Sequence, residues 1–103
     1  MTHPNKRRGN TFERELVNMA KDLGLNAVRA YSSDGRSLGK SEKVDIMIEN
    51  VTIQAKKRAK IAEYIKIPDD VDMVVVRENR GKPLAIVPFE KILILIKEGV
   101  WKN

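Results

Sequence analysis

Alternation of apolar and polar residues is clearest in the middle of the chain, where it predicts two neighbouring β-strands. Every second residue of Val44–Ile48 is apolar, and so is every second residue of Val51–Ala55. A period of two is typical of strands with one buried face. The polar pair Glu49-Asn50 suits a tight turn, so we expect a hairpin built from residues 43–48 and 51–57.

A helical pattern precedes this hairpin. Apolar residues recur at three- and four-residue spacing from Phe12 to Leu23, and Gly24 is well placed to end the helix. Asn10 is a suitable N-cap, with Glu13 three residues later as in a capping box, so we expect the helix to begin there. Residues 1–9 are polar and basic without periodicity. We therefore expect a flexible basic arm followed by a single domain of residues 10–103.

The remaining elements follow from weaker patterns. We expect a strand at 26–31, a flexible loop at 32–41, a weakly helical segment at 59–65, a buried strand at 72–77, a strand at 84–87 and a helix at 89–98. This order argues for an α/β fold in which a central mixed sheet is flanked by helices.

The polar positions of the hairpin carry candidate chemistry. A two-residue turn sets Asp45 opposite Gln54, and Lys56 falls on the same face two positions along. Mg²⁺ prefers oxygen ligands, which Asp45, Gln54 and the backbone carbonyl of Ala55 can supply. Lys56 is suited to orient a water or to stabilise charge on phosphorus. The pattern therefore favours a catalytic site for phosphodiester cleavage.

Ordinary structural roles compete with this interpretation. Glu13 lies beside the apolar stripe of the first helix, so its side chain would lean over the sheet, but it also fits the capping position. Lys56 could be a surface lysine, and Asp45 an exposed strand acid. Aspartate is disfavoured in strands, however, which favours a functional role for Asp45.

The composition favours a polyanionic partner. The 20 Lys and Arg outnumber the 14 Asp and Glu, for a net charge of +6. The absence of cysteine excludes disulfides and thiolate metal sites. With no apolar segment long enough for a signal peptide or a membrane span, we expect a cytoplasmic protein without a membrane partner.

Several short runs carry a family resemblance: Gly9–Leu16, Ala27–Ala30, Val44–Ile46 and Ile53–Lys56, with a Ser-Gly loop before the third. In this order they resemble the archaeal Holliday junction resolvases of the PD-(D/E)xK nuclease superfamily, over about residues 9–58. The resemblance implies an αβββαβ-type core with a restriction-endonuclease-like fold. It also implies Mg²⁺-dependent cleavage (with Mn²⁺ as a substitute) by a homodimer that cuts two strands symmetrically.

Carried over by position, Glu13 matches the helix acid, Arg14 its neighbour in the motif, Asp45 the first metal acid and Lys56 the catalytic lysine. Glu13 thereby joins the predicted metal ligands. Either Ser32 or Ser33 matches the loop serine near the scissile phosphate. The predicted nucleic-acid contacts are Lys6, Arg7, Arg8, Arg14, Arg29, Ser32, Ser33, Arg36, Lys40, Lys43, Lys57 and Arg58.

Gln54 departs from the family pattern, since those resolvases carry glutamate there. A Gln-x-Lys variant resembles the Mrr-like restriction nucleases of the same superfamily. The substitution leaves the site one negative charge short.

The last predicted helix is apolar nearly all round, because residues 92–96 are all Ile or Leu. We expect Ile92, Leu93, Leu95 and Ile96 to form a homodimer interface. The alternative is burial within the monomer, with Trp101 closing over the end.

These observations predict a Mg²⁺-dependent, structure-selective endonuclease of DNA recombination and repair, acting on four-way junctions. The alternatives are a DNA-binding module that keeps the nuclease fold without catalysis, and a small Mrr-like nuclease of duplex or flap DNA.

Overall fold

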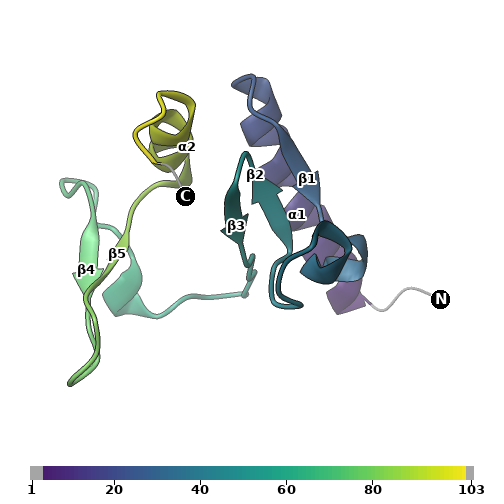
Figure 1. The fold of residues 1–103 in the computed structure, drawn as a ribbon. Helices are drawn as coiled ribbons and strands as arrows, with labels where there is room; N and C mark the ends of the chain where they lie inside the picture. The colour runs from purple at the N-terminus through teal and green to yellow at the C-terminus, as the bar shows by residue number, and fades with distance from the viewer. Residues whose placement is uncertain (1–3, 102–103) are drawn as a thin grey trace.

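The chain folds into two helices and two small sheets (Figure 1). A computed structural model describes residues 4–101, with backbone alone for residues 4–10 and 33. The helices are α1 (Pro4–Asp22) and α2 (Phe89–Lys97); the strands are β1 (Ala27–Arg29), β2 (Ile46–Ile48), β3 (Val51–Ile53), β4 (Val74–Val76) and β5 (Leu84–Ile86). Short 3-10 turns are η1 (Tyr31–Ser33), η2 (Gly35–Leu38) and η3 (Glu63–Ile65). In the described part of the chain, neither helix has the length and apolar character of a membrane span.

Helix α1 begins at Pro4, six residues before the predicted start. Proline suits the first turn of a helix, where its missing N–H costs no hydrogen bond. Asn10 therefore lies inside the helix, and the predicted N-cap at that residue is wrong. Residues 4–9 of the expected flexible arm are helical, while residues 1–3 lie outside the described residues.

The predicted end of α1 is confirmed. Gly24 has a φ of +83°, and its N–H donates to Lys21 O over 2.9 Å. The Leu25 N–H donates to Ala20 O over 3.1 Å. The two bonds form a Schellman motif, which satisfies carbonyls that the last turn leaves open.

Strands β1, β2 and β3 form an antiparallel sheet with β2 in the centre. In the β2–β3 hairpin Ile48 pairs with Val51 and Ile46 with Ile53, which confirms the predicted register and two-residue turn. Glu49 opens the turn with a φ of +52°.

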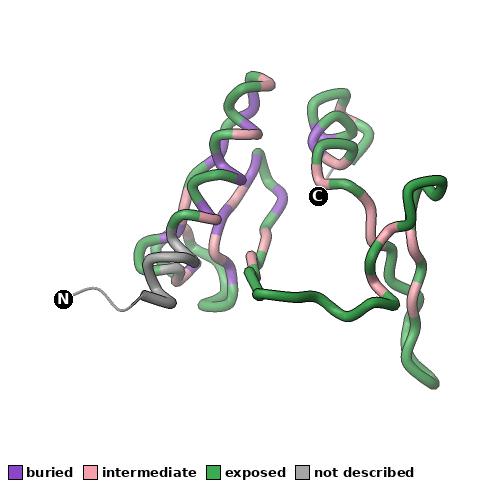
Figure 2. Tube along the Cα trace, turned by 180° about the vertical axis from the view of Figure 1, so that it is seen from behind, coloured by how far each residue is buried: buried purple, intermediate pink, exposed green. Residues whose placement is uncertain are grey.

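The core of the protein lies on one face of this sheet. Ile46 and Ile48 are completely buried, and α1 packs Leu16, Val17 and Ala20 into the same cluster. Burying a side chain of isoleucine size contributes roughly 1.5–3 kcal/mol. The purple buried positions of Figure 2 therefore gather in α1, the first sheet and α2.

Helix α2 returns to this core after the second sheet. Leu93 and Ile96 are 1% and 6% exposed, so these two predicted interface residues pack within their own chain. Ile92 is half-buried against the core, whereas Ile94 and Leu95 are 42% and 36% exposed. The outward face of the helix is therefore still apolar.

Strands β4 and β5 form a separate antiparallel sheet rather than joining one mixed sheet. An extended segment after β3 leads to it, and it stands apart from the first sheet in both views (Figures 1 and 2). The predicted strand at 72–77 is confirmed as β4, but its predicted burial is wrong, since Val75 is 60% exposed. The α/β fold class is confirmed, with its core built on the first sheet alone.

The loop between β1 and β2 is built from 3-10 turns, although its composition predicted a flexible segment. Gly35 is buried at its centre. A Cβ added there would lie 2.3 Å from Ser41 O and 2.6 Å from Val44 Cβ. Only glycine fits this close approach of two backbone segments.

Replacing Gly35 by alanine should destabilise the protein by about 1–3 kcal/mol, because the loop must open to admit the methyl group. Urea unfolding followed by circular dichroism measures this loss. Gly81→Ala is the matched control, since its added Cβ comes no nearer than 3.3 Å to any neighbour. Equal stability of the two variants would contradict the close packing around Gly35.

Candidate functional site

Asp45 lies immediately before β2, where the pairing with β3 changes. Its carbonyl accepts the Ala30 N–H over 2.7 Å, in register with the β1–β2 ladder. Its own N–H donates to Ile53 O over 2.9 Å, one residue short of the Gln54 partner that we predicted. This is the pattern of a β-bulge, which bends a strand and redirects a side chain.

The redirected side chain reaches the backbone of the neighbouring segment. Asp45 Oδ2 accepts the Ala55 N–H over 2.7 Å in a half-buried position. A charged acceptor makes this bond stronger than an ordinary neutral one. The carboxylate is therefore held against the Gln54-Ala55-Lys56 segment, and its Oδ1 has no hydrogen-bond partner among the described residues.

Gln54 and Lys56 lie beyond the end of β3, on either side of Ala55. Both side chains are exposed, and neither has a hydrogen-bond or ionic partner among the described residues. The structure thus brings Asp45 to Ala55 and leaves the two flanking side chains open to a ligand.

Glu13 faces the sheet from α1 and is only 5% exposed. Its Oε1 lies 3.4 Å from Nε of Arg29, the last residue of β1. The next residue, Ala30, is the one that bonds to the Asp45 carbonyl. Glu13 therefore leans over the sheet as predicted, but its carboxylate interacts with Arg29.

The donors predicted for a metal at this site are all oxygens: the Asp45 carboxylate, the Gln54 amide and the Ala55 carbonyl. This chemistry fits Mg²⁺, which takes one or two carboxylates and keeps several waters. In residues 4–101, as far as their side chains are described, no cluster of three His, Cys, Asp or Glu residues could hold a metal. A metal here would depend on neutral oxygens and water.

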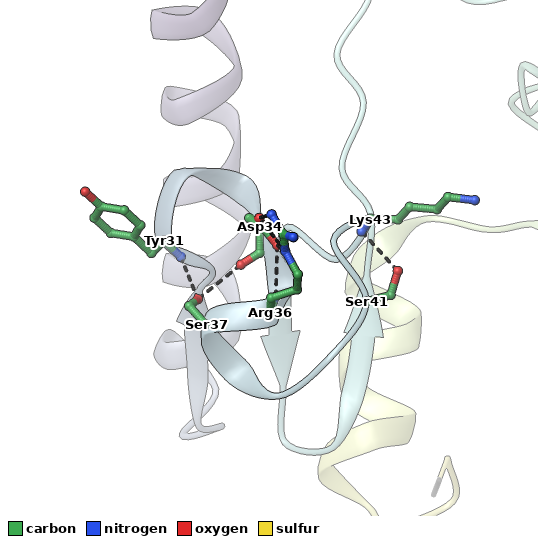
Figure 3. Close-up of polar contacts among 6 residues, drawn as sticks. All are labelled: Tyr31, Asp34, Arg36, Ser37, Ser41 and Lys43. Carbon is green, nitrogen blue, oxygen red and sulfur yellow. Dashed lines mark hydrogen bonds and ion pairs between the residues drawn. The ribbon is translucent and has the colours of Figure 1, made fainter.

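The loop after β1 is held by a small hydrogen-bond network (Figure 3). The Tyr31 N–H donates to Ser37 Oγ over 3.0 Å, and the Ser37 hydroxyl donates to Asp34 O over 3.1 Å. The Asp34 N–H donates to Tyr31 O over 2.9 Å. The network fixes the backbone that leaves β1.

Arg36 forms an ion pair with Asp34 in the same loop. Hydrogen bonding from Arg36 lowers the pKa of Asp34 below its ordinary value, and Asp34 in turn raises the pKa of Arg36. Because the pKa of the acid is lowered, the pair forms at neutral pH and is lost only in acid. Arg36, a predicted DNA contact, is therefore partly neutralised within the loop.

The other predicted nucleic-acid contacts divide by exposure. Arg14, Ser32, Lys40, Lys43, Lys57 and Arg58 are exposed. Arg14 and Arg29 also line, with Lys21, a groove of about 380 Å³ between α1 and β1. Lys6, Arg7 and Arg8 belong to α1, but their side chains, like that of Ser33, lie outside the described residues.

Two residues near the site escaped the sequence analysis. Ser37 is the centre of the loop network, and Tyr31 is 80% exposed directly after Ala30. Nothing in the sequence distinguished Ser37 from the five other serines and glycines of residues 32–41, which are equally common in turns. Tyr31 was assigned to the predicted strand at 26–31, whereas β1 ends at Arg29 and Tyr31 begins the 3-10 turn η1.

A comparison with protein-family models matches residues 4–97 to the family described as archaeal Holliday junction resolvase (hjc). The match covers most of the chain, so the chain belongs to this family of junction-resolving nucleases. It extends well beyond the segment on which the sequence resemblance rested. Neither the curated proteins nor the solved structures contain a match.

The Glu13–Arg29 pair should stabilise the fold as a unit. Glu13→Gln and Arg29→Met remove its two charges, and a double-mutant cycle should give a coupling free energy of about 1–2 kcal/mol. The physical reason is the burial of Glu13, which makes loss of the nearby cation costly. Urea unfolding of the four proteins measures the coupling, and strictly additive losses would contradict it.

Proposed function

We propose that the chain is a metal-dependent endonuclease that cuts DNA four-way junctions. The observation that carries the proposal is the Asp45 carboxylate bonded to the Ala55 N–H over 2.7 Å, beside Lys56, in a chain of the resolvase family. In this proposal the Asp45 carboxylate and the Ala55 carbonyl bind the metal, and Lys56 binds the scissile phosphate beside it.

Mg²⁺, or Mn²⁺ in its place, would be held by Asp45, the Gln54 amide oxygen and the Ala55 carbonyl. Such an ion supplies charge stabilisation at the phosphate and lowers the pKa of a bound water. The Ala55 N–H holds the Asp45 carboxylate in one orientation, which reduces the entropy lost on binding. Lys56, exposed at the end of the segment, donates hydrogen bonds to the scissile phosphate and offsets its developing charge.

Glu13 enters this proposal as a second, more distant acid. Its interaction with Arg29 holds both side chains beside β1, close in the fold to Asp45. Arg29, 27% exposed in its side chain, is in a position to pair with a DNA phosphate once the substrate is bound. A direct role of Glu13 in holding the metal would require this ion pair to rearrange.

The DNA backbone would run over the exposed cations around the site. Lys40 and Lys43 lie in the loop before β2, and Lys57 and Arg58 follow Lys56. Arg14 extends this surface along α1. Contacts of this kind position the duplex arms rather than read bases.

A second candidate function is DNA binding without cleavage, and one observation favours it. Gln54 is neutral and Glu13 pairs with Arg29, which among the described residues leaves Asp45 as the charged ligand that the candidate site offers a metal. A site with less negative charge binds a divalent cation more weakly.

Cleavage of a synthetic four-way junction in Mg²⁺ tests the proposed function. Asp45→Asn keeps an oxygen for the Ala55 N–H but removes the charge, so nicking should fall by about 100-fold while junction affinity is retained. Lys56→Ala should also impair nicking, because the phosphate loses its nearby cation. Lys82→Ala, which removes an exposed lysine between β4 and β5, is the matched control and should cut at nearly the wild-type rate.

The same assay separates the alternatives. A wild-type protein that binds the junction but does not cut it in Mg²⁺ or Mn²⁺ is a binding module. If Gln54→Glu then cuts the junction, the lack of cleavage activity is due to Gln54. Faster cutting of linear duplex or flap DNA than of the junction would favour the Mrr-like alternative.

We further propose that the protein is a homodimer, since paired cuts across a junction require two sites related by symmetry. The exposed apolar residues Ile94 and Leu95 of α2 supply the contact, together with the half-buried Ile92. Leu93 and Ile96 support this surface from within the core.

Sedimentation velocity should give twice the chain mass for the wild type and a monomer for Leu95→Glu, because a charge at the interface opposes association. Val75→Glu places the same charge on the second sheet and should remain dimeric. If Val75→Glu is monomeric and Leu95→Glu is dimeric, the dimer interface lies on β4 and not on α2.

A further inference from the structure

Tyr31 is the most exposed aromatic residue that adjoins the candidate site. Its side chain is 80% exposed, and it follows Ala30, whose N–H bonds to the Asp45 carbonyl over 2.7 Å. In Figure 3 the ring extends outward from the loop, away from Asp34 and Arg36. The exposed ring is therefore carried by a backbone that begins one residue from the contact with Asp45.

The backbone that carries this ring is fixed on both sides. Its N–H donates to Ser37 Oγ and its carbonyl accepts the Asp34 N–H. Ser32, the next residue, has a φ of +50°, an unusual conformation for a residue with a side chain. A tyrosine on a fixed backbone has only two torsions left to order, so it contacts a ligand at small entropic cost.

The same loop offers cations for the DNA backbone. Lys43 extends from the other side of the loop in Figure 3, with its N–H bonded to Ser41 Oγ. Tyr31 and Lys43 thus extend from separate sides of one loop that internal hydrogen bonds hold together. A phosphate bound by lysine and a base bound by tyrosine would meet this element from two directions.

We propose that the Tyr31 ring stacks on a nucleobase of the DNA bound at the Asp45 site. The proposal rests on the proposed junction-binding function and adds a specificity-determining residue to it. A base presents an open face only where stacking is interrupted, as at a branch point, and a continuous duplex offers none along its length. Tyr31 therefore favours branched over linear DNA.

The test compares binding of two probes, a four-way junction and a linear duplex of the same sequence, by fluorescence anisotropy. Tyr31→Ala should weaken junction binding by about tenfold, the usual effect of losing one stacked base, and leave duplex binding nearly unchanged. Tyr31→Phe keeps the ring and should bind like the wild type. Tyr64→Ala is the matched control, because Tyr64 is 75% exposed in η3, away from the first sheet (Figure 1).

A spectroscopic readout locates the contact. With 2-aminopurine placed in turn at each position of the crossover, one position should be quenched by the wild type and by Tyr31→Phe, but not by Tyr31→Ala. Thermal unfolding of Tyr31→Ala should match the wild type, since the ring is exposed.

Each other outcome overturns the proposal that Tyr31 stacks specifically on a base at the branch point. If Tyr31→Ala binds the junction as tightly as the wild type, Tyr31 makes no contact with the DNA. If Tyr31→Phe loses as much junction affinity as Tyr31→Ala, the contact is made by the hydroxyl and not by the ring. Equal losses on both probes show a contact without branch specificity. In all three cases the proposed function still stands if the wild-type protein prefers and cuts junctions. A wild-type protein without that preference contradicts both the stacking proposal and the proposed function.

Discussion

Burial of Ile46 and Ile48 sets the register of the central hairpin, and the position of the candidate site depends on it. Both side chains are completely inaccessible to solvent. Because side chains alternate along a strand, a slip of one residue would turn both into water and bring polar groups into the core. The register in turn places Asp45 at the first position before the regular ladder. Core packing therefore determines where the carboxylate lies, and a single hydrogen bond to Ala55 determines how it points.

The site combines a rigid acid with exposed partners. Asp45 is held by three hydrogen bonds, two through its backbone and one through its carboxylate. Gln54 and Lys56 carry no such restraint and lie in water. Glu13 is the reverse case, since it is buried and compensated by Arg29. The balance of charge around Asp45 consequently depends on whether Arg29 stays with Glu13 or turns to the substrate.

The elements that could be predicted from the sequence are those formed by interactions between residues close together in the chain. The hairpin register was predictable because the alternation of residues 44–55 is a local pattern with one buried face. The bulge at Asp45 was not, since a regular turn implied Gln54 as its partner and the Ala55 bond depends on three-dimensional geometry. The start of α1 was missed because Asn10 and Glu13 imitate a capping box inside a helix. The apolar run at 73–76 looked buried, but Met73 and Val75 are 49% and 60% exposed. Of the site, the positions of Asp45 and Glu13 were predictable, while Tyr31 needed the loop structure.

The loop of residues 31–44 starts and ends at one place, because Ala30 bonds to Asp45 across its base. The residues of this loop are held together by the hydrogen bonds of Ser37, by the Asp34–Arg36 ion pair and by the packing of Gly35 against Val44. A closed insertion of this kind costs little additional entropy as it lengthens. Its length can therefore change at small cost while the carboxylate beneath it keeps its place, so that exchange of this single loop offers a route to a different substrate preference.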